Sequence, residues 1–156
     1  IKMQMLTLFI KNQLSFFWLP SAWICGVRVD SEESNKCSVR VKLGFFNKNP
    51  FKSLFWAVQG MAAEMPGGLL LQNKIKSSGQ NIAMLLVGSS SKFTKKAVGK
   101  ILFTFEQGEL LDELVNQAVK TKEAQTITIK TNGVDEKGDV VSEFSFNWSI
   151  KLRSKK

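Results

Sequence analysis

The chain has 156 residues, and we expect a single domain over residues 1–156, because this length allows one hydrophobic core. With 44% hydrophobic and 22% charged residues and no long apolar run, it is typical of a soluble globular protein that neither spans nor binds a membrane. It contains no histidine, which excludes Ser-His-Asp triads, Cys-His dyads and the common zinc sites.

The formal net charge is +9, and lysines are dense at residues 92–100 and in a basic tail, residues 154–156. This balance favours an anionic partner such as nucleic acid, a membrane surface or a phosphorylated small molecule, although scattered lysines also form ordinary solvated surfaces. The aromatic residues lie in apolar runs and do not alternate with lysines, so the sequence disfavours nucleic acid as the partner.

Residues 1–20 have the apolar character of a signal peptide, but Lys11 interrupts them and no small-residue cleavage site follows. We therefore expect an N-terminal helix that ends before Pro20. Cys25 and Cys37 flank a polar turn, and strand geometry of roughly 3.3 Å per residue places them beyond disulfide reach. Free thiols indicate a cytoplasmic location.

The remaining pattern alternates strands and helices. Period-2 runs and turn residues predict strands over residues 23–29, 37–45, 81–93, 100–106, 124–131 and 139–151. Helical patterns cover residues 51–65 and 109–120, and Pro66-Gly67-Gly68 is expected to end the first of them.

Glu64 is the most informative residue, because no other residue between Lys52 and Lys74 is charged. Burying an unpaired carboxylate is costly, so this side chain is either satisfied by specific donors or retained for chemistry. At about 100° per residue, the small or flexible residues Ser53, Gly60 and Met61 share its side of the helix. They leave room for a packed strand, a water or a ligand chain.

The order of these elements, with a long helix after two strands and four more strands behind it, resembles the α+β hot-dog fold of acyl-thioester enzymes. In the phenylacetate-pathway type of hot-dog thioesterase, an Asn ends the loop before the helix, a His-Gly-Gly or similar small-residue turn opens the helix, and an acidic residue follows nine residues after that His. Asn49, Phe55-Trp56-Ala57 and Glu64 occupy these positions. The family's aromatic-x-(Arg/Ser)-Pro-Ala-x-x-Gly segment resembles residues 93–99, FTKKAVG.

The stretches NPFKSLFWAVQGMAAE and GDVVSEFSFNWSIKLR resemble more closely an uncharacterised branch of this superfamily, known mainly as a domain of unknown function. The resemblance implies an antiparallel sheet wrapped around a long buried central helix, with an N-terminal helix and a short helix between the fourth and fifth strands. It also implies a homodimer or a dimer of dimers that requires no metal and no cofactor.

The resemblance further implies an acyl-CoA thioesterase-like site at a dimer interface. The backbone amides of Trp56 and Ala57 would polarise the thioester carbonyl, and Glu64 would act as general base or nucleophile, with Asn49 as the second catalytic residue. From the residues alone, Asn49 is explained as a helix N-cap before Pro50. The CoA phosphates would bind Lys92, Lys95 and Lys96, and the acyl chain would contact Ser53, Gly60 and Met61.

Two departures keep a second function open. Trp56-Ala57 replaces the family's Gly-Gly, and Leu86 stands where some relatives carry a water-positioning hydroxyl. A non-catalytic hot-dog protein that binds an acyl or other apolar ligand fits these departures, and a basic nucleic-acid-binding module is the remaining alternative. Ordinary core or turn roles also explain Glu64 and the lysines.

Overall fold

The structure is a computed structural model that describes residues 2–153, with side chains from Met5 onward. The expected basic tail, residues 154–156, lies outside this described part. The helices are α1 (Lys2–Trp18), α2 (Pro20–Ile24), the 3-10 helix η1 (Phe45–Asn47), α3 (Trp56–Ser77) and α4 (Gly108–Thr121). The strands are β1 (Arg28–Glu32), β2 (Cys37–Lys42), β3 (Ile82–Phe93), β4 (Lys100–Phe105), β5 (Gln125–Val134) and β6 (Val140–Leu152).

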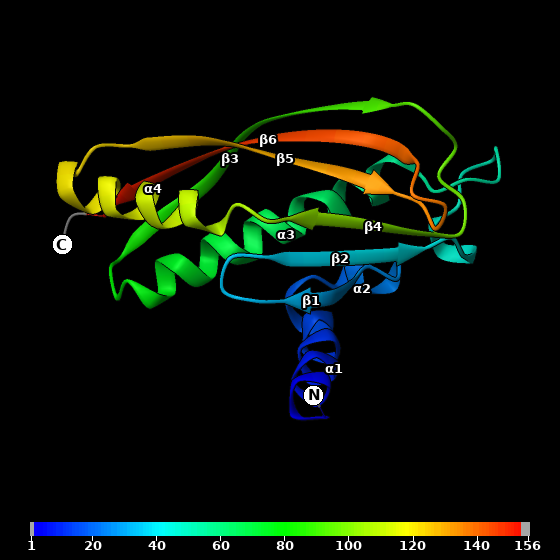
Figure 1. Ribbon diagram of the computed structural model, residues 1–156, viewed down its shortest axis with the longest axis horizontal. Coiled ribbons are helices and arrows are strands. Elements are labelled where there is room, and N and C mark those ends of the chain that lie inside the picture. Colours follow the sequence, from blue (N-terminus) through cyan, green and yellow to red (C-terminus); the bar gives the residue numbers. More distant parts are fainter. Residues whose placement is uncertain (1, 154–156) are drawn as a thin grey trace.

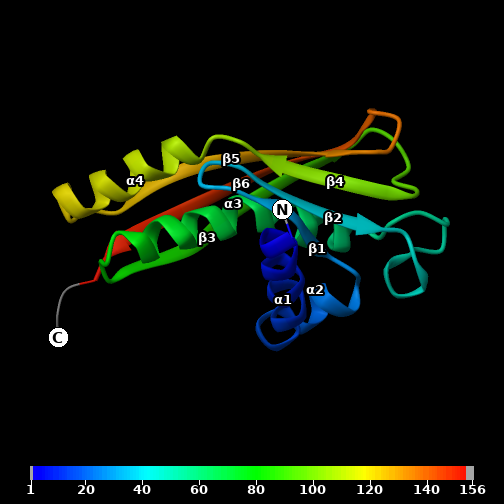
Figure 2. The same ribbon diagram turned by 60° about the horizontal axis from the view of Figure 1, so that its bottom comes forward.

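All six strands form one antiparallel sheet in the order β1-β2-β4-β5-β6-β3. Helix α3 lies along one face of this sheet, and α4 lies beside it (Figures 1 and 2). Side chains on alternate positions of β6 point toward α3 and are buried: Phe144, Phe146, Trp148 and Ile150. The predicted α+β arrangement, a sheet around a long buried helix with α4 between β4 and β5, is confirmed.

The expectation that Pro66-Gly67-Gly68 ends the central helix is wrong, because α3 continues to Ser77. Pro66 cannot donate a hydrogen bond to the carbonyl of the preceding turn, yet tertiary packing holds the helix together there. The Thr131 hydroxyl of β5 donates to the Ala63 carbonyl at 2.8 Å. Pro66, Gly67 and Gly68 are all buried, so contact with the sheet outweighs the local helix-breaking signal.

The first predicted strand begins five residues too early. Trp23 lies in α2, because Pro20 fits the first turn of a helix and starts this short element. The Arg28 side chain lies 4.6 Å from the centre of the Trp23 ring and donates to the Trp23 carbonyl at 2.8 Å. The strand therefore starts only at Arg28.

The turn between β5 and β6 is also shorter than the sequence indicates. The predicted strand ends at residue 131, but Asn132 and Gly133 also lie inside β5. A Cβ atom on Gly133 would come within 2.7 Å of the Phe103 ring. This glycine is explained by close packing between strands, and the turn itself spans Asp135 to Gly138.

The Gly67→Ala substitution tests the contact that fixes the height of α3 above the sheet. An added Cβ would lie 2.6 Å from Ile129 Cγ2, inside the core, so we expect a loss of about 1–3 kcal/mol in the free energy of unfolding. Gly60→Ala is the matched control, because its nearest neighbour would be Phe144 at 3.7 Å. Urea denaturation checks both; an unchanged stability of Gly67→Ala would contradict the tight contact.

Candidate functional site

Gly60, Glu64 and Gly68 lie four residues apart and form one stripe on α3. This stripe faces the aromatic side of β6. A Cβ on Gly60 would lie 3.7 Å from Phe144, and one on Gly68 would lie 3.5 Å from the Trp148 ring and 2.5 Å from Glu64 Oε1. The Glu64 carboxylate therefore lies over Gly68, next to Trp148.

Glu64 is partly buried, and within residues 2–153 no hydrogen bond or ion pair of its carboxylate is present. Burial raises the pKa of Glu64, since the charged form loses water without gaining a partner. The sequence left two explanations open: Glu64 is satisfied by specific donors, or it is retained for chemistry. Residues 2–153 provide no donor to its carboxylate, so the first explanation is not supported. A raised pKa makes this carboxylate a stronger base than an exposed glutamate, which suits it to proton transfer.

Trp148 is a site residue that the sequence analysis treated only as part of a strand. Its side chain is 8% exposed, and its Nε1 donor has no acceptor in the described part of the chain. It lies in β6 beside the Glu64 and Gly68 positions. The four-residue spacing of Gly60, Glu64 and Gly68 could have predicted that bulky side chains pack closely against this stripe.

The first turn of α3 offers free backbone donors. Phe55 is the N-cap residue and makes no side-chain cap hydrogen bond. The first amides of any helix have no carbonyl of the preceding turn to bind. The amides of Trp56 and Ala57 also form no other hydrogen bond within residues 2–153. The Trp56 indole is 60% exposed and packs edge-on against Phe55. These amides and the positive end of the helix can stabilise a carbonyl oxygen.

Asn49 and Ser53 lie in the loop before α3 and bind each other. Asn49 Oδ1 accepts from the amides of Phe51 and Ser53 at 2.9 and 3.2 Å, and Asn49 Nδ2 donates to the Ser53 hydroxyl at 3.0 Å. Asn49 thus caps a loop turn and not the helix, which starts seven residues later. Ser53 precedes α3 and does not share the stripe of Glu64, whereas Met61 does lie on α3, half-buried against the core.

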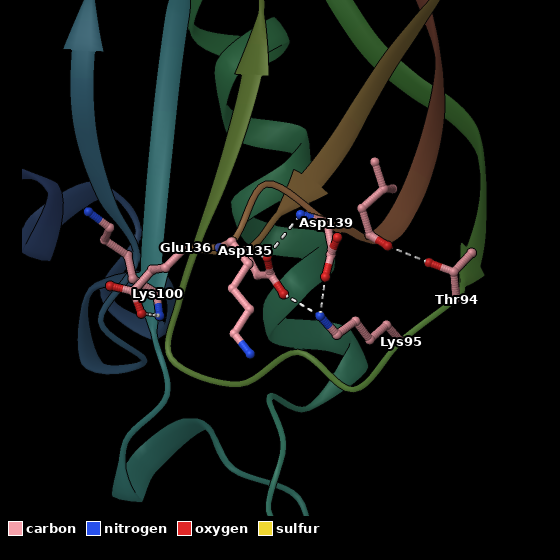
Figure 3. Close-up of polar contacts among 8 residues, drawn as sticks. Thr94, Lys95, Lys100, Asp135, Glu136 and Asp139 are labelled. Atoms are coloured by element: carbon pink, nitrogen blue, oxygen red, sulfur yellow. Dashed lines mark hydrogen bonds and ion pairs between the residues drawn. The ribbon is translucent and has the colours of Figure 1, made fainter.

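The three lysines predicted to bind phosphates do not converge. Lys95 forms ion pairs with Asp135 and Asp139 at 2.7 and 2.6 Å, and these contacts raise its pKa (Figure 3). Lys96 lies beside the loop before α3, where its Nζ approaches the Phe51 carbonyl at 3.4 Å. Lys92 is paired in register with Glu143 on the sheet face that points away from α3. Only Lys96 is both near the start of α3 and without a carboxylate partner in the described residues.

Strand β3 forms the free edge of the sheet beside this site. A bulge between Leu86 and Gly88 shifts the register, so Ser89 and Ser91 stand opposite Phe146 and Phe144 on the α3 side. Both serines are exposed. The sequence analysis placed Leu86 where some relatives carry a water-positioning hydroxyl. The structure shows that the hydroxyl groups of Ser89 and Ser91 lie on the same face of this edge strand.

The cysteine thiols are separate from the site. Cys25 and Cys37 are both free, as expected. Burial, assisted by the nearby Glu32, raises the pKa of the Cys37 thiol to about 12, which makes it a poor nucleophile.

The sheet order and the buried central helix define a hot-dog fold, and solved structures share it. The chain is similar to PA5026 of Pseudomonas aeruginosa, a protein of unknown function and probable thioesterase (TM-score 0.81, 19% identity, 92% and 95% of the two chains covered). It is also similar to the thioesterase HI1161 of Haemophilus influenzae (TM-score 0.66, 12% identity, 93% and 90% covered). A protein of unknown function from Chlorobaculum tepidum matches with a TM-score of 0.76, 14% identity and coverage of 92% and 93%.

The chain belongs to the family described as Domain of unknown function (DUF4442), which matches residues 10–150. This agrees with the resemblance to an uncharacterised branch of the hot-dog superfamily. None of the curated proteins shows significant sequence similarity. Among the described helices, none combines the length and apolar character needed to cross a bilayer.

Glu64→Gln is expected to stabilise the protein at neutral pH. Because burial raises the pKa of Glu64 in the folded state, the folded protein holds this proton more tightly than the unfolded chain does. Stability attributable to Glu64 is therefore greatest at low pH and is lost as the pH rises through the raised pKa. The Gln variant cannot ionise and does not lose this stability at high pH. Each kcal/mol gained in the free energy of unfolding raises Tm by about 2–4 °C.

Thermal unfolding of both proteins between pH 4 and pH 8 measures this effect. The two Tm curves should approach each other at the acidic end and separate as the pH rises. A Gln variant that is less stable than the parent at pH 8 would indicate that the carboxylate has a stabilising partner.

Proposed function

We propose that this protein hydrolyses acyl thioesters of coenzyme A at a site between two protomers. The observation that carries the proposal is Glu64, a partly buried carboxylate without a partner in residues 2–153 and with a raised pKa, on a glycine-flanked stripe of α3. As general base, Glu64 takes a proton from water while the water oxygen attacks the thioester carbonyl. The thiolate of coenzyme A leaves and the carboxylic acid remains.

The geometry of α3 supports a site shared by two protomers. Trp56 and Ala57, the proposed carbonyl contacts, are seven or eight residues from Glu64. At 1.5 Å per residue, this is roughly 11–12 Å along the helix, too far for both to act on one thioester group. An antiparallel α3 from a second protomer would bring its first-turn amides opposite Glu64.

The free edge of β3 supplies a surface for such a partner. Leu85, Leu86 and Val87 are exposed there, beside the exposed Phe93. An exposed apolar edge strand invites pairing with another strand. Pairing of β3 with its copy would continue the sheet and place the two α3 helices on the same face. The partner would also cover the acyl chain along Gly60 and Met61.

Coenzyme A phosphates are proposed to bind at the loop that carries Lys95 and Lys96. Lys96 is the stronger candidate, since Lys95 would have to exchange its two carboxylates for phosphate. Lys92 lies on the other sheet face and would contribute only through long-range attraction. Asn49 and Ser53 shape the neighbouring loop, so they act as positioning residues in this proposal.

A non-catalytic function as an acyl-binding protein is the alternative. It is favoured by the bulky Trp56 at the first turn of α3, where close approach of a carbonyl to backbone amides requires space. The same apolar ligand and the same dimer would serve both functions.

Thiol release from short, aromatic and long acyl-CoA substrates tests the hydrolase. We expect Glu64→Gln to lower kcat by at least about 100-fold, the usual contribution of general acid–base catalysis. The parent's kcat should rise with pH through the raised pKa of Glu64, since only the carboxylate accepts the proton. Glu113→Gln, on exposed α4, is the matched control and should retain the parent rate.

Absence of activity in the parent on every substrate would reject hydrolysis. Saturable binding of a non-hydrolysable acyl-CoA analogue by that same protein would then support the acyl-binding alternative.

The Leu86→Lys substitution tests the dimer. A lysine on the α3 side of the free edge strand would face its own copy across the interface, so we expect monomers in sedimentation velocity and loss of thiol release. Leu110→Lys on α4, also exposed and apolar, should leave the dimer unchanged. A parent that sediments as a strict monomer would contradict the shared site.

A further inference from the structure

The outward face of α1 is apolar, although it points away from the rest of the chain. Figures 1 and 2 show α1 projecting from the body of the molecule, next to α2 and β1. At about 100° per residue, four exposed side chains share this outward face: Met5, Leu6, Phe9 and Phe17. Ile10 and Phe16 flank it, and the Phe16 ring packs edge-on against Trp23 at 5.1 Å. Phe17 is 75% exposed and the adjacent Trp18 is 81% exposed.

Polar side chains of α1 form its hydrogen bonds and ion pair with the body of the protein, and Leu8 packs against the core. Lys11 forms an ion pair with Glu32 of β1. Asn12 forms two hydrogen bonds with the backbone of Val29, donating to its carbonyl at 2.9 Å and accepting from its amide at 2.8 Å. A surface helix normally buries its apolar stripe, but α1 leaves most of its described apolar side chains exposed. Within the described residues, most of its apolar face therefore has no covering partner.

A groove of about 710 Å³ extends this apolar surface between α1 and α3. Leu14, Met65 and Leu69 line it, together with the cations Lys11 and Lys76. None of the described residues that line it is a carboxylate.

The charge of this region complements an anionic surface. Residues 1–63 contain three carboxylates, and two of them are already paired, Asp30 with Arg40 and Glu32 with Lys11. The third, Glu33, lies in the turn between β1 and β2. Arg28, which stacks on the Trp23 ring, and Lys76, which lines the groove, have no carboxylate partner in the described residues.

The proposed dimer leaves α1 uncovered. Strands β1 and β3 form opposite edges of the sheet, and α1 packs against β1. A partner that joins through β3 is therefore remote from α1. This step rests on the dimer of the proposed function, but the surface itself does not depend on hydrolysis.

We propose that α1 docks this protein on an anionic membrane surface. The apolar face enters the boundary between headgroups and acyl chains, where Phe and Trp side chains are favoured, and lipid phosphates bind Lys76 and neighbouring cations. The helix lies on the membrane and does not span it. This proposal departs from the sequence-based expectation that the protein binds no membrane.

Co-sedimentation of the full chain with vesicles tests the proposal. We expect binding to equimolar phosphatidylcholine and phosphatidylglycerol, and weaker binding to phosphatidylcholine alone. Phe9→Asp and Phe17→Asp should each lower the partition coefficient by about tenfold or more, because each removes a large apolar side chain from the interface. Leu110→Asp on α4 is the matched control and should bind as the parent does. Thermal unfolding confirms that each variant is folded.

Three results would overturn the proposal. The first is a parent that does not sediment with anionic vesicles, or that binds both vesicle types equally. The second is unchanged binding of both Phe variants. The third is a parent assembly larger than a dimer that Phe9→Asp reduces to a dimer, which would identify a second copy of this chain as the partner. None of these results requires enzymatic activity, so failure of the hydrolase proposal is detected separately.

Discussion

The close contact between α3 and β5 determines where the candidate site groups lie. Gly67 brings the helix against Ile129, and the Thr131 hydroxyl binds the Ala63 carbonyl in the turn that Pro66 weakens. A side chain at position 67 would raise the helix off the sheet. Since Glu64 is one turn away, its burial and raised pKa follow directly from this contact.

The same packing explains how the Glu64 carboxylate lies partly buried without a partner among residues 2–153. Glycines precede and follow Glu64 at four-residue intervals, so aromatic rings of β6 approach the helix closely on both sides. These rings remove water but accept no charge, and the unpaired Trp148 Nε1 adds a second unsatisfied group nearby. Folded proteins rarely place two buried polar groups without hydrogen-bond partners side by side, because each such group costs free energy that packing must offset. In the proposed function, the bound thioester and its attacking water meet these groups.

The sequence predicted the architecture because its signals are local and periodic. Alternating residues marked β2 and β6, and the small-residue stretch around Glu64 marked α3. The prediction failed where a local signal competed with tertiary contacts: at Pro66, which the sheet supports, and at Gly133, which packs against Phe103. The ion pairs of Lys95 join residues 40 or more apart, and the bulge near Val87 changes which side chains face α3. Neither can be read from residue counting.

Two exposed apolar surfaces of the molecule, on β3 and on α1, thus lie at opposite edges of one sheet. The β3 edge carries an apolar strand beside an unpaired carboxylate, which fits a second copy of the chain. The β1 edge carries α1, whose polar side chains Lys11 and Asn12 bind the body of the molecule. Exposed apolar side chains and nearby cations of this edge face outward. Because the sheet separates them, assembly at one edge does not hinder contact at the other. A dimer formed through β3 would present two copies of α1, and two weak membrane contacts on one particle bind far more tightly than one.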